Sequence, residues 1–312
     1  MISYDYRYLQ SLYPYIPSQI EKVCRISDIL ARISQIPFLR ERLSLYGGTA
    51  LNFIHFSEIH RLSVDIDFNY RHQGEETDWG EIRVMIDADL KQILSSQGYP
   101  DHDIKIDPSY PLSRFTIKYI NHMDTDDTFK IETGYMRRIP VLTEDAYMSL
   151  RHIGTDALHT IKTPQTEEIY ANKLVTLLAR ATPRDLYDVY RIAGTRVNQT
   201  RLRKITIIES LMSLQEPIIE IDVEKTLNII SLDDRLRTVL KTQEKLEITE
   251  IRKEAIAYTN QIIDSITNEE KQCINRFYTE KQFDPRPLKL ENIHPEINAH
   301  PAITRALQQL ES

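Results

Sequence analysis

Hydrophobic and polar positions follow two different periods in the first half of the chain. Between residues 17 and 36, isoleucine, leucine and valine recur at steps of three and four, which predicts an amphipathic helix. In "SVDIDFNY", residues 63–70, the pattern changes to strict alternation, with Asp65, Asp67 and Asn69 on the face opposite the apolar residues. A period of two predicts a β-strand.

Shorter patterns predict the remaining elements of this half. A strand "LSLYG" is followed by a helix "TALNFIHFSEIH", which begins behind Gly47 and Gly48 with Thr49 as its cap. A second helix, "WGEIRVMIDADLKQILSSQG", ends at Gly98. The segments "RFTIKYI" and "TFKIETGY" predict two further strands, joined by the polar turn "NHMDTDD".

From about residue 142 the pattern becomes helical over long stretches. Helices are predicted for "EEIYANKLVTLLAR", "PRDLYDVYRIA", "LRKITIIESLMSL", "EKTLNIISL" and "EITEIRKEAIAYTNQIIDSI". We therefore predict an α/β protein, with a mixed sheet and flanking helices in residues 1–160 and a mostly helical domain in residues 161–312. The boundary is expected between residues 155 and 164.

Composition narrows the class of protein. The 312 residues are 41% hydrophobic and 27% charged, as in folded proteins, and the formal charge of −7 argues against a chain that coats nucleic acid through bulk electrostatics. The two cysteines, Cys24 and Cys273, show no disulfide or zinc spacing, and His55 and His60 do not align as zinc ligands. With neither an apolar run long enough to span a membrane nor a signal peptide, we expect a cytoplasmic protein without a membrane partner.

The two aspartates of the alternating strand are the first candidate for chemistry. Residues i and i+2 of a strand lie on one face about 6–7 Å apart, so Asp65 and Asp67 repel each other unless a cation lies between them. Mg²⁺ favours one or two carboxylates together with phosphate oxygens. The alternative is a solvated sheet face, which is the commoner explanation for an isolated D-x-D.

A possible phosphate site precedes the aspartates. Gly47 and Gly48 end a strand and open a helix, whose free backbone N–H groups and dipole favour an anion, and Thr49 adds a hydroxyl. A tight turn that needs glycine is the alternative. Glu132 can lie on the same sheet face as the aspartates. There it could be the third ligand of a two-metal site or accept the proton. The alternative is that Glu132 belongs to a surface strand on which lysine and glutamate alternate with apolar residues.

Together these segments resemble a known family. "GGTAL" followed by "RLSVDIDF" resembles the first motif of the AbiEii/AbiGii toxin family of nucleotidyltransferases, related to the DNA polymerase β superfamily, with Gly48-Thr49 where that superfamily usually has Gly-Ser. "KIE" at 130–132, "EIYANK" at 168–173 and "RDLYD" at 184–188 resemble the second to fourth motifs. The resemblance covers residues 45–192.

The resemblance implies a nucleotidyltransferase-type mixed sheet and a helical domain that completes the active site. It assigns Mg²⁺ to Asp65, Asp67 and Glu132, and the triphosphate of a nucleoside triphosphate to Gly48 and Thr49. Lys173 and Arg184 would hold phosphates, while Asp188 would orient Lys173 or the acceptor hydroxyl. An ion pair between Arg184 and Asp188, one helical turn apart, is the simpler alternative.

Residues 173–204 concentrate positive charge in an acidic chain. They contain eight lysines and arginines and two acids, a net charge of +6 beside the predicted phosphate site. This segment favours an RNA acceptor, whose binding would be sensitive to salt. A solvated helical face is the alternative for four of these residues, which are Arg191, Arg196, Arg201 and Arg203.

The implied function is that of a toxin in a bacterial toxin–antitoxin or abortive-infection system. An acceptor hydroxyl, expected at the 3′ end of tRNA, would attack the α-phosphate of the nucleoside triphosphate in line, and pyrophosphate would leave. Translation would then stop, and a separate antitoxin protein is expected as a partner. A transferase that modifies a protein hydroxyl and a nucleotide-binding regulator without transfer activity are the two alternatives.

Overall fold

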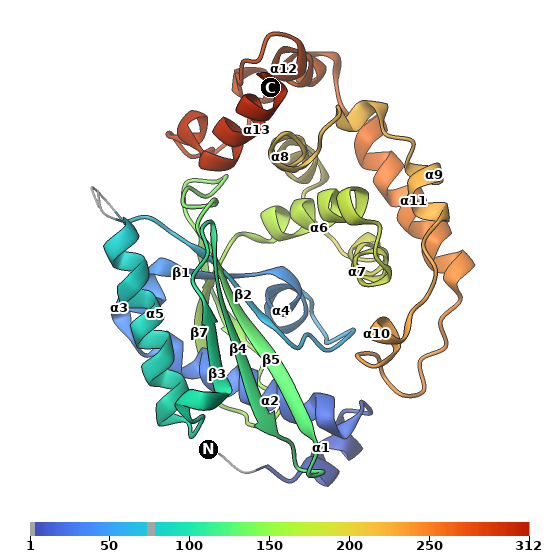
Figure 1. Ribbon diagram of the computed structural model, residues 1–312. Helices are drawn as coiled ribbons and strands as arrows, with labels where there is room; N and C mark the ends of the chain where they lie inside the picture. The colour runs from blue at the N-terminus through green and yellow to red at the C-terminus, as the bar shows by residue number, and fades with distance from the viewer. Residues whose placement is uncertain (1–3, 74–78, 312) are drawn as a thin grey trace. The chain divides into compact units, whose positions relative to one another are not determined.

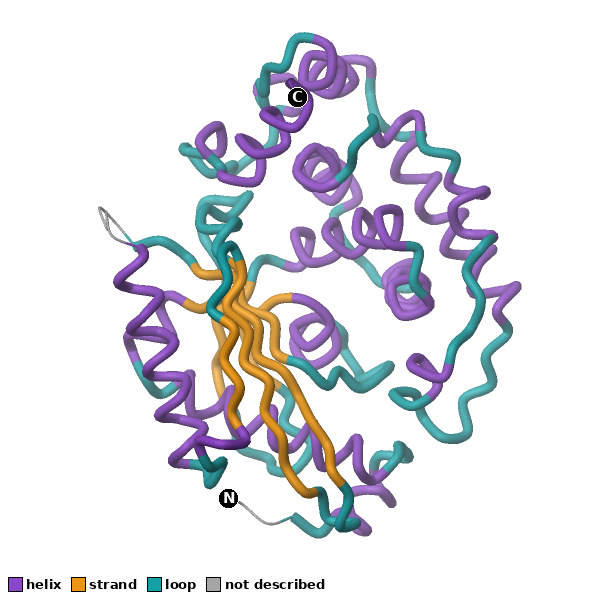
Figure 2. Tube along the Cα trace, viewed as in Figure 1, coloured by secondary structure: helices purple, strands orange, loops and turns teal. Residues whose placement is uncertain are grey.

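The computed structural model describes residues 4–73 and 79–311. The chain divides into two units, neither of which is continuous in sequence (Figure 1). The first comprises Met1–Arg138, Asp145–Pro164 and Thr238–Glu244, and the second comprises Ile139–Glu144, Gln165–Arg237 and Lys245–Ser312. In the described ranges every assigned strand belongs to the first unit, and the second is built from helices (Figure 2).

A five-stranded sheet organises the first unit, in the order β1-β2-β5-β4-β3. β2 and β5 pair in parallel and the other neighbours are antiparallel, so the sheet is mixed, as predicted. A separate hairpin is formed by β6 and β7. The strands are β1 (Leu43–Tyr46), β2 (Ile66–Tyr70), β3 (Ile104–Asp107), β4 (Leu112–Ile120), β5 (Asp126–Gly134), β6 (Ala146–Leu150) and β7 (His159–Thr163).

Helices cover both faces of this sheet. Figure 1 shows α5 on one face and α4 on the other. The face under α5 is aromatic, with Tyr135 packed between Tyr70 and Trp79 at ring distances of 5.4 and 6.0 Å. The helices of this unit are α1 (Tyr6–Leu12), α2 (Pro17–Ser34), α3 (Pro37–Arg42), α4 (Gly47–Ala50), the π-helix η1 (Leu51–His55), α5 (Trp79–Ser96) and the 3₁₀ turn η2 (Asp101–Asp103).

The second unit packs helices around α6, which contacts both α7 and α8. Pro183 opens α7 at a position where its missing N–H has no helical partner, and Thr182 caps this helix by accepting a hydrogen bond from Asp185 N. The helices are α6 (Thr166–Arg180), α7 (Pro183–Ala193), α8 (Gln199–Ser213), α9 (Val223–Asn228), α10 (Asp234–Arg237), α11 (Ile248–Asp264), α12 (Asn268–Thr279) and α13 (Pro301–Glu311), with 3₁₀ turns η3 (Ile218–Glu220), η4 (Arg286–Leu288) and η5 (Ile297–Ala299).

The long periodic segments are helices and the alternating segments are strands, which confirms the predicted fold class. The prediction that Thr49 caps a helix was wrong. Tyr46 is the N-cap of α4 and Thr49 lies inside the helix, because Gly47, with φ of +67°, turns the chain directly out of β1. The hairpin of β6 and β7 was not predicted, since neither strand carries a long apolar run.

A half-buried histidine, His55, links the end of η1 to two strands. Thr163 Oγ1 donates a hydrogen bond to Leu45 O at 2.9 Å and therefore accepts one from His55 Nε2 at 3.0 Å. Burial lowers the pKa of His55 to about 4. Protonation of this ring therefore opposes folding.

We predict that His55 makes the folded protein less stable in acid. Because its pKa is near 6.5 when unfolded and about 4 when folded, stability is lost as the pH falls through this interval. The free energy of unfolding, measured with urea, should fall between pH 7 and pH 5 by about 2 kcal/mol more in the native chain than in the His55→Gln variant. Equal losses in the two proteins would contradict this assignment.

Candidate active site

The sheet brings three of the predicted acids to one region of the first unit. Asp67 lies in β2, and Asp65 comes immediately before that strand. In the parallel pairing of β2 with β5, Asp67 stands opposite Glu132, and in the pairing with β1 it stands opposite Tyr46. The two aspartates and the glutamate therefore come from adjacent positions on two neighbouring strands.

Two of the acids already have partners within the sheet. Asp65 Oδ1 accepts a hydrogen bond from Lys130 N at 3.1 Å, which fixes its carboxylate against β5. Glu132 Oε1 forms a 2.6 Å ion pair with Arg114 Nε, its register partner on β4. In residues 4–73 and 79–311, no group of three or more His, Cys, Asp or Glu side chains is arranged as a metal site.

Gly47 brings the chain directly against the Asp67 carboxylate. A Cβ atom at Gly47 would lie 2.3 Å from Asp67 Oδ2, far inside van der Waals contact, and the φ of +67° also favours glycine. A side chain at this position would have to displace the acid. The backbone of the glycine turn is therefore packed directly against the Asp67 carboxylate, with no room for a side chain between them.

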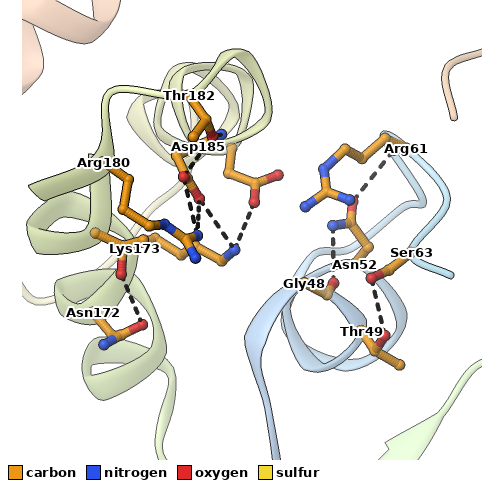
Figure 3. Close-up of polar contacts among 12 residues, drawn as sticks. Gly48, Thr49, Asn52, Arg61, Ser63, Asn172, Lys173, Arg180, Thr182 and Asp185 are labelled. Carbon is orange, nitrogen blue, oxygen red and sulfur yellow. Dashed lines mark hydrogen bonds and ion pairs between the residues drawn. The ribbon is translucent and has the colours of Figure 1, made fainter. Parts of the chain in front are cut away.

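Gly48 is enclosed by a second group of polar residues. A Cβ at Gly48 would lie 2.8 Å from Arg61 Nη2 and 2.9 Å from Ser63 Oγ, so the segment before β2 packs closely against the turn after β1. Asn52 joins them, because its Nδ2 donates to Gly48 O at 3.0 Å and its Oδ1 accepts from Arg61 N at 3.3 Å (Figure 3).

Arg61 places a buried positive charge beside this turn. The residue is 4% exposed, and its Nη1 donates to Leu62 O at 3.0 Å. Reasoning from sequence gave neither Arg61 nor Asn52 a role. The spacing "R-x-S-x-D" was the available signal for Arg61, whereas nothing in the local pattern marks Asn52.

Thr49 connects the helix start to the first aspartate. The residue is fully buried, its Oγ1 donates to Asp65 O, and Ser63 Oγ lies 3.0 Å away. The hydroxyl that was predicted to contact a triphosphate thus bonds to the backbone of Asp65. It holds α4 and the segment before β2 together.

The predicted residues of the second unit form a buried cluster of charges. Lys173 Nζ lies 2.9 Å from Asp188 Oδ2 and 3.9 Å from Asp185 Oδ1, and all three residues are nearly inaccessible to solvent. Arg180 Nη2 adds a bond to Asp185 at 3.0 Å (Figure 3). Lys173 is therefore held in one position by carboxylates from α7.

Several other basic residues between 173 and 204 are engaged within the second unit. Arg184 donates from Nε and Nη2 to Arg235 O at 3.3 and 3.1 Å. Arg203 Nε pairs with Glu270 at 2.9 Å, and Arg201 Nη2 donates to Gln165 at 2.7 Å. The net charge of +6 counted from sequence is thus partly compensated by residues outside the segment.

A mixed sheet with paired acids beside a glycine turn is an arrangement used by nucleotidyltransferases. The chain belongs to the AbiEii family of nucleotidyltransferase toxins, which act in type IV toxin–antitoxin systems, because the sequence model of that family matches residues 28–261. This confirms the predicted family and enzyme class. The family also implies a nucleotide substrate and an antitoxin partner.

Structural comparison gives a similar fold. MenT4, the nucleotidyltransferase toxin Rv2826c from Mycobacterium tuberculosis H37Rv, aligns with a TM-score of 0.59 and 14% sequence identity, covering 94% of each chain. Among curated proteins, no sequence matches this chain. Within the described ranges no helix is both long and apolar enough to cross a membrane.

The glycine turn generates a prediction about stability. Gly47→Ala introduces both left-handed strain and a clash with Asp67, whereas Gly98→Ala introduces left-handed strain alone, because nothing lies within 4 Å of its Cβ position. We expect urea unfolding to show a loss of about 1 kcal/mol for Gly98→Ala and a clearly larger loss for Gly47→Ala. Equal losses would mean that Asp67 moves freely away from the turn.

Proposed function

We propose that the protein uses Mg²⁺ to transfer a nucleoside monophosphate from a nucleoside triphosphate to a hydroxyl at the 3′ end of tRNA. The observation that supports this most directly is the packing of Gly47 against Asp67. It places the glycine turn directly against an acid of the adjacent strand, and a helix start that favours anions beside a carboxylate that can hold Mg²⁺ suits a metal-bound triphosphate. The product tRNA would no longer support translation, which is how the toxin would act, in the cytoplasm.

The residues present fit a magnesium ion. Asp67 in β2 and Asp65 just before this strand supply hard oxygen ligands. Mg²⁺ usually takes only one or two carboxylates and completes its shell with phosphate oxygens and water. Asp65 Oδ1 is oriented by Lys130 N, so less conformational freedom is lost when it binds a cation. Asp65, Asp67 and, in a second position, Glu132 are the proposed ligands.

The side chains of this chain would align the reacting groups. Gly48 and the backbone of Thr49 would contact the triphosphate, while the Thr49 hydroxyl keeps Asp65 in place. When bound, the metal would neutralise charge on the phosphates and polarise the α-phosphorus. The acceptor hydroxyl would then attack in line, and pyrophosphate would leave, with positioning and electrostatics supplying most of the rate enhancement.

The second unit is proposed to complete the active site through Lys173, Arg184 and Asp188. Lys173 and Arg184 would neutralise phosphate charge, and Asp188 would orient Lys173, with which it forms an ion pair of 2.9 Å. This ion pair supports the orienting role of Asp188, because it holds the Lys173 ammonium in one position. The antitoxin is proposed to be a separate protein.

A protein hydroxyl is the alternative acceptor. RNA is favoured by the basic segment 173–204, although Arg203 and Arg201 are bound within the unit. Arg196 has no hydrogen bond or ion pair within the described part of the chain and is the best candidate of the segment for a phosphate contact. Binding of tRNA would then weaken as the salt concentration rises.

We predict that the two aspartates are essential for transfer. Asp65→Asn and Asp67→Asn keep the side-chain volume but remove the negative charge, so transfer from each labelled triphosphate to total RNA should fall by at least a hundredfold. Asp101→Asn, at an exposed carboxylate paired with Lys91, is the matched control and should retain activity.

The same assay, repeated with a cell extract that contains both RNA and protein, separates the acceptors. Label on tRNA supports the proposal, label on protein supports the alternative acceptor, and absence of label with every triphosphate would favour a regulator without transfer activity. Full activity in both aspartate variants would contradict the mechanism.

A further prediction concerns Glu132, which is both a proposed ligand and the partner of Arg114. If Glu132 acts on the metal or on the proton, Glu132→Gln should lower transfer about a hundredfold, while Arg114→Gln changes it little. Steady-state assays with matched circular dichroism spectra would measure this. Equal and small effects of the two substitutions would show that Glu132 serves only the ion pair with Arg114.

A further inference from the structure

Positive charge collects at one end of the sheet in the first unit, where the parallel strands β2 and β5 both end. Five cations lie on the chain segments that meet there, all of them exposed or half-buried, and they are Arg40, Arg42, Arg137, Arg138 and Lys162. We call this surface the basic end. None of the five is assigned a role in nucleotide transfer.

Hydrogen bonds fasten the segments of the basic end to one another. Arg71 N donates to Arg42 O at 2.8 Å, and Arg71 Nη1 donates to Arg137 O at 2.6 Å. Lys162 Nζ donates to Glu41 O at 2.7 Å. The segments that carry the five cations are therefore held together before any ligand binds.

Little of this charge is neutralised by neighbouring acids. Asp145, whose side chain is 1% exposed, is bound by the equally buried Arg71 at 2.8 Å. Arg40 and Arg138 form no ion pair among the residues that the structure describes. Glu41 is exposed on the same segments, and five cations with one such carboxylate give a net charge of +4 in a chain whose total is −7.

Aromatic rings alternate with the cations. Arg137 lies over the ring of Tyr46 at 5.6 Å, and Arg138 lies over the ring of Trp79 at 5.0 Å. Tyr110 packs against Trp79 at a ring distance of 5.2 Å and is itself 53% exposed. The row of rings and guanidinium groups is therefore open to solvent at Tyr110.

A second exposed ring belongs to Tyr147, which is 49% exposed. It stands opposite Lys162 in the pairing of β6 with β7. Burial raises the pKa of Tyr147, and the positive charge of nearby Arg40 lowers it. A flat group stacked on this ring would thus have two cations beside it.

Exposed rings flanked by cations suit single-stranded nucleic acid, because bases stack on the rings while the cations neutralise phosphates. Bases within a duplex are already stacked and paired, so an unpaired strand fits this surface better. The surface also adjoins the candidate active site, since Tyr46, under Arg137, is the register partner of Asp67.

We propose that the basic end binds the unpaired strand at the 3′ end of tRNA, with bases stacked on the exposed tyrosines and phosphates held by the surrounding arginines and lysine. The inference rests on the proposed transfer to tRNA and adds the surface that would guide the acceptor strand. Tyr147 and Arg40 would bind RNA without taking part in the chemistry.

Fluorescence anisotropy tests this proposal without relying on transfer activity. The full-length chain carrying Asp65→Asn and Asp67→Asn would be titrated into tRNA labelled at its 5′ end, in EDTA and without nucleotide. On this background Tyr147→Ala should weaken binding about tenfold, because a base loses its stacking partner. Tyr147→Phe keeps the ring and should bind like the parent protein.

The salt dependence of binding reports on the phosphate contacts. Each cation that holds a phosphate of a single strand contributes about 0.7 to the slope of the logarithm of affinity against the logarithm of salt concentration. Arg40→Gln should therefore lower the magnitude of this slope by about 0.7.

Matched controls lie on α1, at the opposite end of the hairpin of β4 and β5, where Tyr6 packs against His122 at 4.7 Å. Tyr8→Ala removes a ring that is 60% exposed, and Arg7→Gln removes an exposed arginine. Both should leave the affinity and the salt slope unchanged. Thermal unfolding would confirm that every variant is folded.

The RNA itself supplies the last comparison. We expect tRNA from which the unpaired 3′ nucleotides have been removed to bind at least tenfold more weakly. Absence of tRNA binding, equal affinity for the trimmed tRNA, or unchanged affinity in Tyr147→Ala would overturn the proposal. If the native chain nevertheless transferred nucleotide to tRNA, the proposed function would stand and only this surface would be wrong.

Discussion

The close packing of the Asp67 carboxylate against Gly47 is the constraint on which the candidate active site depends. β1 and β2 are adjacent antiparallel strands, so the turn that leaves β1 must pass the residue of β2 that pairs with Tyr46, and that residue is Asp67. Only a residue without a Cβ can make this turn. The glycine at position 47, the register of β1 with β2 and the position of the Asp67 carboxylate therefore depend on one another.

Other polar contacts extend this constraint to the rest of the loop. Thr49 binds the Asp65 carbonyl, and Asn52 connects Gly48 to the backbone of Arg61. Each of these side chains is buried, so each hydrogen bond also meets the requirement that enclosed polar groups find partners. The turn, the start of the helix and the segment before β2 therefore form one connected network. Movement of any one of them would leave buried polar groups unsatisfied.

Features that depend on neighbouring residues could be predicted from the sequence, whereas contacts between residues far apart along the chain could not. The alternation around Asp67 reports a local property, the pleat of a strand, and it predicted β2 and the face that carries the acids. The parallel neighbour of Asp67 is Glu132, which lies on β5 in both the prediction and the structure, and whether it binds a metal stays a prediction. Long helices such as α6 were similarly evident from their period.

Contacts set by register or by distant segments could not be predicted from local patterns. Arg114 reaches Glu132 because the hairpin of β4 and β5 sets their pairing, and a shift of one residue would have separated them. The burial of Arg61 depends on packing over Gly48, which no periodicity encodes. The cap predicted at Thr49 failed for a related reason, since the positive φ of Gly47 starts the helix two residues earlier.

The most direct test of the central claim is a crystal structure of the protein with Mn²⁺ and a non-hydrolysable nucleoside triphosphate, solved with anomalous data. The account predicts an anomalous peak bound to carboxylate oxygens of Asp65 and Asp67 at about 2.1–2.2 Å, with the phosphates against Gly48. A metal and nucleotide bound elsewhere, with both carboxylates facing bulk solvent, would contradict it.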